Sequence, residues 1–350
     1  MCTNFHIKTK NNAVIVGRSM DNELLLPPAF YIHPRNKPLS NKHVSLTHNK
    51  GIESQSSVYG YVGVNINSLP SINEIKGVNL RNIIVDGMNE KGLSAGFLYM
   101  PGTKYQKPAD ENSDIRVHFL CHWVLANYAT VDEVKEKLPN HHVCWYPGLD
   151  ALFPFYLAVV DNTGQSIVIE FKDGNMLISD NLVGVSTNEP WFDWHLENLN
   201  NYAFIHPYTQ KSFIMGEHKV SPYEGGGALC IPNQSSSVGR FIRTAYQKHY
   251  LIEQENADDA FNAVTHMLNS IDHPPGMILD TENANEPTDG KVDVTRWAAI
   301  KNLTDGVFAL RIYNNMRFRA LDLRKIDFDK VNAQILELPI LPPFEYIEPK

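Results

Sequence analysis

Residues 2–21 read CTNFHIKTKNNAVIVGRSMD, and this stretch holds the strongest strand signal near the N-terminus together with the first candidate chemistry. Its second half is an apolar, β-branched run that ends at a glycine and a polar turn, which is the pattern of a buried strand. If residues 2–9 pair with residues 12–20 as a hairpin, the charged side chains of Arg18 and Asp21 come to lie near the N-terminal cysteine. The stretch therefore predicts the start of a sheet with a polar cluster at one end.

The composition is that of a globular chain. Its 350 residues are 43% hydrophobic and can bury a substantial core, and we expect a single domain over residues 1–350. Lys and Arg number 31 against 39 Asp and Glu, a formal charge of −8 without a basic block, so nucleic acid is not an expected partner. The longest apolar run, at 151–160, is about half the ~20 residues of a membrane helix and contains Pro154, so no membrane span is expected.

The cysteines are widely spaced and form no C-x-x-C motif; they are Cys2, Cys121, Cys144 and Cys230. Neither a disulfide framework nor a zinc ribbon is indicated, and reduced thiols in the cytoplasm are the default expectation. A signal peptide trimmed from ahead of Cys2 would instead make the protein periplasmic. The segment HHVCW at 141–145 lacks further ligands at zinc spacing, so we expect no metal and no cofactor.

Further strands are predicted in three blocks. Two apolar segments joined by the turn NEKG predict a hairpin at 83–100. Short apolar runs separated by polar turns predict an antiparallel meander at 155–187, and three more strands are expected at 296–323.

Helical patterns lie between these blocks of strands. Amphipathic periodicity predicts helices at 116–129, 238–254 and 258–271, and the capping box T-V-D-E at 130–133 predicts another short helix. The polar, Pro- and Gly-rich segment at 272–293 is expected to be a surface loop. This order indicates an α+β fold in which helices cover antiparallel sheets, rather than a parallel βαβ array.

A cysteine directly after the initiator methionine has a specific chemical option. If an aminopeptidase removes Met1, Cys2 carries a free α-amine and a thiol on the same Cα, which is a nucleophile with its own base. The ordinary pKa of an α-amine is about 7.7–8.0, close to working pH. Arg18 would favour the thiolate, and Asp21 could accept a hydrogen bond from the amine. Plainer interpretations stay open: a small second residue merely permits methionine removal, and Arg18 and Asp21 form a structural ion pair.

Five segments make the pattern more specific, in the order MCTNF, GRSMD, VDGMNEKGLSAGFLYMPG, GVSTNEPWFDWHLENLNNY and SSSVGRFIRTAY. Together they resemble the cholylglycine (choloylglycine) hydrolase family of N-terminal-nucleophile hydrolases, which includes bile salt hydrolases and penicillin V acylases. The resemblance covers residues 2 to about 250. It implies a four-layer αββα sandwich with two antiparallel sheets between helix layers. It also implies exposure of the cysteine by methionine removal or autoprocessing, and hydrolysis of a linear amide without metal or cofactor.

The resemblance also implies a catalytic set, namely Cys2, Arg18, Asp21, Tyr99, Asn188 and Arg240. Cys2 is the expected nucleophile, and Arg240 matches the family arginine near it. The side-chain amide of Asn188 and the backbone N–H of Tyr99 are the expected donors to the oxyanion. Taken singly, Asn188 would also fit a turn, Arg240 a surface position and Tyr99 the core; only the joint match favours the site.

The loop NELLLPPAF at 22–30 follows the predicted site directly. Its two prolines prevent a helix and its leucines need apolar surroundings, so the loop either lines an acyl pocket or caps the core. The first interpretation gives a substrate-binding set of Met20, Leu24, Leu26 and Phe30.

The expected function is hydrolysis of a small N-acyl amide through an acyl-thioester intermediate. Penicillin V acylase-like chemistry is favoured because Tyr99 stands where bile salt hydrolases usually carry asparagine and penicillin V acylases tyrosine. The alternatives are a conjugated bile salt hydrolase, an N-acyl homoserine lactone acylase and a homologue that binds acyl amides without turnover. The resemblance through FDWHLENLNNY at 192–202 implies a homotetramer built partly by that segment.

Overall fold

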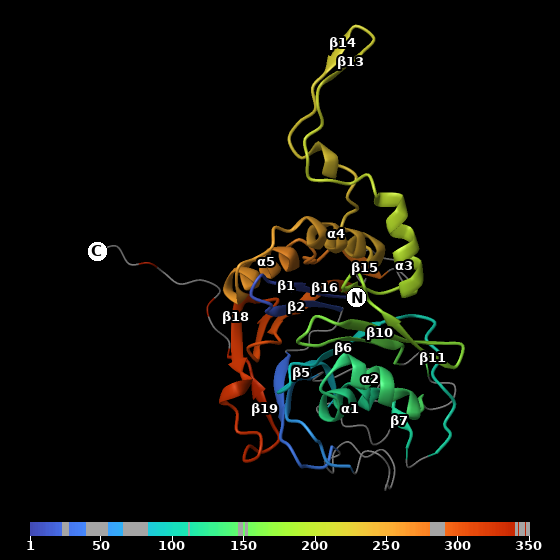
Figure 1. The fold of residues 1–350 in the computed structure, drawn as a ribbon, viewed down its shortest axis with the longest axis vertical. Helices are drawn as coiled ribbons and strands as arrows, with labels where there is room; N and C mark the ends of the chain where they lie inside the picture. The colour runs from blue at the N-terminus through green and yellow to red at the C-terminus, as the bar shows by residue number, and fades with distance from the viewer. Residues whose placement is uncertain are drawn as a thin grey trace.

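The architecture is a stack of four layers, in which two antiparallel sheets pack face to face between helices (Figure 1). The computed structural model describes residues 1–22, 28–39, 55–65, 83–110, 113–145, 150, 153–280, 291–339, 342 and 347. The predicted α+β class and the αββα order are both confirmed.

The quoted N-terminal stretch lies in a seven-stranded sheet with the order β12-β1-β2-β16-β17-β18, in which β15 pairs with β16. Its strands are β1 Cys2–Lys8, β2 Val14–Asn22, β12 Val185–Ser186, β15 Ile278–Asp280, β16 Lys291–Asn302, β17 Val307–Ile312 and β18 Asn315–Asp322. The predicted hairpin is confirmed, because β1 pairs with β2 and sets Cys2 opposite Met20. Side chains alternate between the faces of a strand, so Cys2, Met20 and Arg18 share one face.

The second sheet has eight strands in the order β11-β10-β9-β6-β5-β4-β3-β19. They are β3 Ala29–His33, β4 Tyr61–Asn65, β5 Ile84–Asn89, β6 Ser94–Tyr99, β9 Phe155–Val160, β10 Ser166–Lys172, β11 Asn175–Asp180 and β19 Gln334–Glu337. The predicted hairpin at 83–100 is β5–β6, and Gly92 in its turn has a φ of 81°, which glycine adopts without strain. Two short strand pairs complete the set, β7 Ile115–Arg116 with β8 Val143–Cys144 and β13 Phe213–Met215 with β14 His218–Val220.

Three strand predictions need correction. The first three strands of the predicted meander pair as expected, but its last segment, β12, leaves for the other sheet and pairs with β1. The loop expected at 22–30 is too long, because Ala29 and Phe30 begin β3 and pair with β4. The loop expected at 272–293 contains β15 and the start of β16, which pair with each other. In each case a short apolar segment found a partner strand that its own sequence does not specify.

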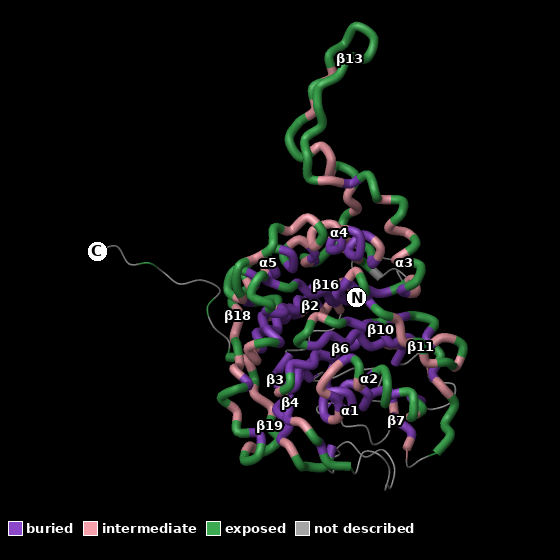
Figure 2. Tube along the Cα trace, viewed as in Figure 1, coloured by how far each residue is buried: buried purple, intermediate pink, exposed green. Residues whose placement is uncertain are grey.

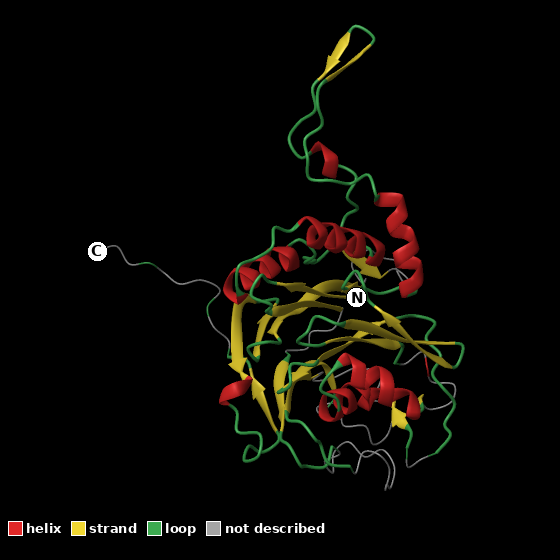
Figure 3. Cartoon of the chain, in the orientation of Figure 1, coloured by secondary structure: helices red, strands yellow, loops and turns green. Residues whose placement is uncertain are grey.

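Five α-helices are described, α1 Leu120–Asn127, α2 Val131–Lys137, α3 Phe192–Asn198, α4 Ser237–Tyr250 and α5 Ala257–Asn269. Helices α4 and α5 cover the outer face of the seven-stranded sheet, whereas α1 covers the eight-stranded sheet (Figure 3). The predicted start of α2 is confirmed, because the Thr130 side chain accepts a hydrogen bond from the Glu133 N–H at 3.2 Å; the Glu133 side chain accepts from the N–H of Ala129, one residue before the position that a capping box requires. Within the described residues, no helix is long and apolar enough to cross a membrane.

The core consists of two hydrophobic clusters, and strand β2 contributes to both of them. Val14 and Val16 of β2 face the other sheet and belong to the cluster that extends to α1. Ile15 points the opposite way, into the cluster beneath α4 and α5 that includes Phe241 and Val264. Figure 2 shows this continuous buried interior through both sheets. Strand β2 is thus buried on both faces, which explains the apolar run at its start, residues 14–16.

Residues 206–232, which we call the arm, extend from the body and end in the β13–β14 hairpin (Figure 1). Figure 2 shows that most of the arm is exposed. Three apolar side chains at its tip, Phe213, Ile214 and Met215, are exposed to 49%, 66% and 64%. Such a group of exposed apolar side chains is typical of an interaction surface.

Candidate active site

Cys2 is buried, and its sulfur lies beside the buried guanidinium of Arg18. Cys2 is 1% exposed, and its Sγ is 3.7 Å from Nη2 of Arg18 and 3.5 Å from Sδ of Met20. Arg18 is fully buried, donates a hydrogen bond to the carbonyl oxygen of Phe97 and has its Cζ 5.6 Å from the Trp297 ring centre. The guanidinium of Arg18 and the sulfur of Cys2 are therefore neighbours in a region closed to solvent.

The backbone nitrogen of Cys2 is held by Asn188. It donates to Oδ1 of Asn188 at 2.6 Å, and Nη2 of Arg240 donates to the same oxygen at 2.9 Å. Nδ2 of Asn188 donates to the carbonyl oxygen of Tyr99 at 2.7 Å. These three contacts fix the orientation of the amide. An amide NH₂ carries two donors and Tyr99 takes one, so the other remains for a group beside the sulfur.

Asn188 is itself anchored through its backbone. Its N–H donates to Oγ of Ser237 at 2.9 Å, and its carbonyl oxygen lies 2.9 Å from Nε2 of His195. Burial lowers the pKa of His195, which favours the neutral ring, and Nε2 must then carry the proton because a carbonyl oxygen only accepts. These contacts join the end of β12 to α3 and α4, so the site depends on three elements that are distant in sequence.

Asp21 lies on the opposite face of β2 from Arg18. Its Oδ1 accepts a hydrogen bond from Oγ1 of Thr295 at 2.7 Å and lies 3.8 Å from Nδ1 of His273. Burial disfavours the charged carboxylate, but contact with His273 and the nearby positive charge of Arg240 outweigh it and lower the pKa of Asp21. The backbone of Asp21 holds the first residue: its carbonyl oxygen accepts from the Met1 amine, and its N–H donates to the Met1 carbonyl at 2.6 Å.

The predicted catalytic residues therefore meet around Cys2, although Asp21 does so mainly through its backbone. Tyr99 borders the site with a half-exposed side chain, 40% accessible, whose ring packs edge-on against Phe155 at 5.9 Å between ring centres. Its place at the end of β6 makes it an aromatic surface next to Asn188.

The predicted substrate-binding residues have different outcomes. Met20 contacts the Cys2 sulfur, as described above. Phe30 lies in the core between the two sheets, where it is 3% exposed and packs edge-on against Phe308 at 5.3 Å between ring centres. Core packing explains that position without a substrate. Leu24 and Leu26 lie outside the described residues.

Sequence reasoning missed the residues that support the catalytic set. Thr3 accepts a hydrogen bond from Nε of Arg240 at 3.1 Å, and Ser237, Thr295 and His273 hold Asn188 or Asp21. Thr3 and Ser237 stand inside the recognised segments, so their hydroxyls next to motif residues were an available signal. Thr295 and His273 stand in no motif, and only the pairing of β16 with β2 brings them to the site.

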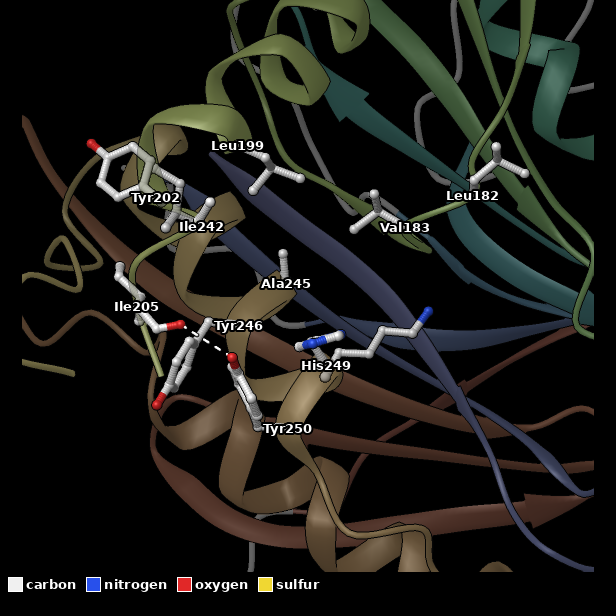
Figure 4. A pocket seen from close by; sticks show the side chains of 12 residues that line it. Leu182, Val183, Leu199, Tyr202, Ile205, Ile242, Ala245, Tyr246, His249 and Tyr250 are labelled. Atoms are coloured by element: carbon white, nitrogen blue, oxygen red, sulfur yellow. Dashed lines mark hydrogen bonds between the residues drawn. The ribbon is translucent and has the colours of Figure 1, made fainter. Parts of the chain in front are cut away.

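A cavity of about 620 Å³ lies elsewhere, beside the start of the arm (Figure 4). It is lined by Leu182, Val183, Leu199, Tyr202, Ala203, Ile205, Ile242, Ala245, Tyr246, Lys248, His249 and Tyr250. None of these residues belongs to the cluster around Cys2, so this cavity is separate from the candidate site. No group of three His, Cys, Asp or Glu side chains suited to a metal ion occurs in the described part of the chain.

Known proteins place this arrangement in a family. The family described as linear amide C–N hydrolases, choloylglycine hydrolase family, matches residues 2–336. A bile salt hydrolase/transferase of Clostridium perfringens is 29% identical over 94% of each chain. A penicillin V acylase of Pectobacterium atrosepticum is 30% identical over 46% of this chain and 39% of its own length.

Solved structures agree in fold. A variant of the conjugated bile acid hydrolase from Clostridium perfringens superposes with a TM-score of 0.79 at 27% identity and 97% coverage of both chains. The penicillin V acylase from Agrobacterium tumefaciens has a TM-score of 0.71 over 95% of this chain and 90% of its own, and its 21% identity supports a likeness of fold alone. With the family match extending over nearly the whole chain, this protein belongs to the choloylglycine hydrolase family and is a hydrolase of carbon–nitrogen bonds in linear amides.

Proposed function

We propose that this hydrolase attacks an N-acyl amide with the sulfur of Cys2, and that the α-amine of the same residue is the base once Met1 has been removed. One observation carries the proposal: the two reactive atoms of Cys2 each face a suitable partner. The sulfur is 3.7 Å from the Arg18 guanidinium, and the nitrogen is 2.6 Å from Oδ1 of Asn188.

The first half of the reaction makes a thioester. The freed amine takes the proton of the thiol, and the sulfur bonds to the acyl carbon of the substrate. The carbonyl oxygen becomes an oxyanion, which the second N–H of Asn188 and the backbone N–H of Tyr99 stabilise. The C–N bond then breaks, and the departing amine takes the proton held by the α-amine of Cys2.

The second half releases the acid. A water molecule gives a proton to the α-amine and attacks the thioester carbon, and the same donors stabilise the second oxyanion. The C–S bond breaks, the carboxylic acid leaves and the thiol of Cys2 is restored. We assign to Asp21 the role of orienting the freed amine of Cys2, in place of the Met1 amine that its backbone carbonyl holds before removal. Arg240 keeps Oδ1 of Asn188 turned toward the amine.

For the substrate we propose a penicillin V-like acyl amide with an aromatic or apolar acyl group. The half-exposed ring of Tyr99 beside Asn188 supports this choice, because an aromatic face favours stacking of such a group. Conjugated bile salts are the second candidate, because the relative matched over 94% of each chain is named a bile salt hydrolase/transferase.

The test compares the parent protein with Cys2→Ser on penicillin V, a conjugated bile salt and an acyl homoserine lactone. Intact mass first confirms that Met1 is absent, and mass spectrometry then quantifies the released amine. We expect the parent to cleave penicillin V and Cys2→Ser to be slower by orders of magnitude, because a serine hydroxyl is a far weaker nucleophile than a thiolate. Near-normal turnover by Cys2→Ser would exclude the mechanism. Cleavage of the bile salt alone would select the second candidate.

We further propose that the protein assembles as a homotetramer built partly by residues 192–202, and that the arm which follows them takes part, because its exposed apolar tip supports association. Ile214→Ser at the tip should reduce the mass measured by sedimentation, whereas Ile252→Ser, at an isoleucine 83% exposed outside the arm, should not. A parent protein that sediments as a monomer would contradict this assembly.

A further inference from the structure

Three ionisable side chains lie together between the two sheets, behind the Cys2 sulfur. They are Arg18 on β2, Lys301 on β16 and Asp86 on β5, and each side chain is 0% exposed. Burial of charge is costly unless the charges are paired. Two cations and one carboxylate leave one positive charge unmatched within this group. Such a buried charge is expected to have a role in the function of the protein.

The two cations are not equivalent partners of the carboxylate. Nζ of Lys301 is 2.5 Å from Oδ1 of Asp86, whereas Nε of Arg18 is 3.7 Å from the same oxygen. The strand register places the cations side by side, because Lys301 lies opposite Val16, two residues before Arg18 on the same face of β2. Lys301 is therefore the main partner of Asp86.

The fold makes room for this group. Gly96 on β6 lies directly opposite Asp86, and a Cβ at that position would be 2.6 Å from Oδ1 of Asp86 and 3.5 Å from Nε of Arg18. A side chain there would push the carboxylate away from both cations. The sequence therefore has a glycine inside a strand, where glycine is otherwise unfavourable, at the point where the charged group needs space.

Besides the carbonyl oxygen of Phe97, which accepts from its Nη2, Arg18 has two competing partners that can carry negative charge. Its Nη2 approaches the Cys2 sulfur at 3.7 Å, and its Nε approaches Asp86 at the same distance. A carboxylate without another partner would attract the guanidinium more strongly and leave less positive charge for the sulfur. The close contact of Lys301 with Asp86 removes that competition.

We propose that Lys301 and Asp86 are positioning residues for the amidase reaction: Lys301 neutralises Asp86, and Arg18 thereby keeps its positive charge for the sulfur of Cys2. The inference rests on the proposed function in taking Cys2 as the nucleophile. Neither residue touches the sulfur; both act through Arg18.

Other titratable groups lie near the sulfur or the pair. The freed α-amine of Cys2 is on the same residue, Tyr156 lies near Cys2 with Glu170 beside it, and Cys121 of α1 lies near the pair. Asp21 is on the opposite face of β2, and Arg240 contacts Thr3 and Asn188. Burial raises the pKa of Tyr156 well above its ordinary value and also raises the pKa of Cys121, so both stay neutral near pH 7. Asp21 and Arg240 are unchanged in the variants below, so differences between those variants report on Lys301 and Asp86.

The experiment measures how fast iodoacetamide alkylates Cys2 as a function of pH, with mass spectrometry of the N-terminal peptide as the readout. It needs no substrate and is made on chains shown to lack Met1. In Lys301→Met, Asp86 loses its partner and draws Arg18 toward itself. We expect the midpoint of the alkylation profile to rise by about one pH unit, so that alkylation at pH 7 slows by up to about tenfold.

A double variant separates positioning from mere structural support. Asp86→Asn combined with Lys301→Met removes the competitor along with its partner, so Arg18 is again available to the sulfur. We expect the profile to return to within about threefold of the parent rate at pH 7. A structural role for the pair would instead make the double variant at least as impaired as the single one.

Two further variants complete the design. Lys301→Arg keeps the charge and should keep the parent profile, and Lys135→Met, which removes a surface lysine 2.8 Å from Asp180, should leave it unchanged. The proposal is overturned if folded Lys301→Met has the parent profile, or if the double variant stays as slow as the single. Should Lys301→Met fail to fold, Asp86→Asn decides: burial lowers the pKa of Lys301, so the lysine can become neutral without its carboxylate, but Arg18 then has no anionic competitor and the midpoint should not rise. A higher midpoint would refute the proposal.

The alkylation profile and the turnover assay fail independently. If Cys2→Ser keeps its turnover, the proposed function is wrong, whereas the profile still reports on the environment of the sulfur. If Cys2→Ser is inactive but Lys301→Met alkylates like the parent, only the role of the pair is wrong.

Discussion

Replacement of Asn188 by alanine would separate transition-state stabilisation from substrate binding. The side chain has two jobs: Oδ1 holds the Cys2 nitrogen and Arg240, and Nδ2 is the proposed donor to the oxyanion. Loss of one oxyanion donor typically raises the barrier by about 3–4 kcal/mol, a loss of about 10²–10³ in kcat. Because the oxyanion exists only after attack by the sulfur, KM should change little.

The same substitution also has a calculable effect on stability. Two buried donors, the Cys2 N–H and Nη2 of Arg240, lose an acceptor, whereas Arg240 keeps Thr3 and the carbonyl of Gln234 at 3.3 Å. An unsatisfied buried donor costs about 1–3 kcal/mol, so the two donors together give an expected loss of about 2–6 kcal/mol in the free energy of unfolding. Steady-state kinetics and urea unfolding measure the two effects, and Asn200→Ala, at an exposed asparagine, is the control. A rise in KM with unchanged kcat would refute the assignment.

Three further predictions follow from the N-terminus and from two buried titratable groups. A non-cleavable extension ahead of Cys2 turns its amine into an amide nitrogen without basicity, so hydrolysis should vanish while the thermal midpoint stays nearly constant; an intact, fully active extended chain would contradict the base assignment. Burial raises the pKa of Glu170 to about 7 from 4.5, so ionisation of this carboxyl destabilises the fold as the pH rises through that range. The variant Glu170→Gln should therefore resist urea better than the parent at pH 8, and the two proteins should be equally stable at pH 4. Burial and the charge of Lys248 lower the pKa of His6 to about 3 from 6.5, so the parent should lose stability as the pH drops through that range. Between pH 7 and pH 4, His6→Gln should lose less urea resistance than the parent.

The strands were predictable where the sequence itself specified the partner. Residues 2–9 and 12–20 are adjacent and form β1–β2, and the turn with Gly92 joins β5 to β6. The sheet that β12 joins was not predictable, because a strand of only two residues carries too little sequence to specify its partner before the rest of the fold is in place. For the same reason the first residues of β3 appeared to be part of a loop.

Only those site residues that stand in a recognisable sequence motif were predictable. Cys2, Arg18, Asn188 and Arg240 stand in recognisable segments, and the structure brings them within hydrogen-bond distance or near it. Lys301 had no such signal, because a lysine near the end of a strand usually points to solvent. Its burial depends on the facing carboxylate of Asp86, which only the packing of two sheets provides.

Side chains alternate between the two faces of β1, so the bond at which an aminopeptidase stops determines whether the first side chain lies on the same face as Arg18. An aminopeptidase that removed one residue too many would leave Thr3 as the first residue, and a threonine with a free amine is chemically able to act as nucleophile and base. Its hydroxyl, however, lies 3.1 Å from Nε of Arg240, on the face of the sheet opposite to Arg18. Over-trimmed chains should therefore be well folded but inert, and the specific activity of a preparation should report the fraction of chains cut at one bond.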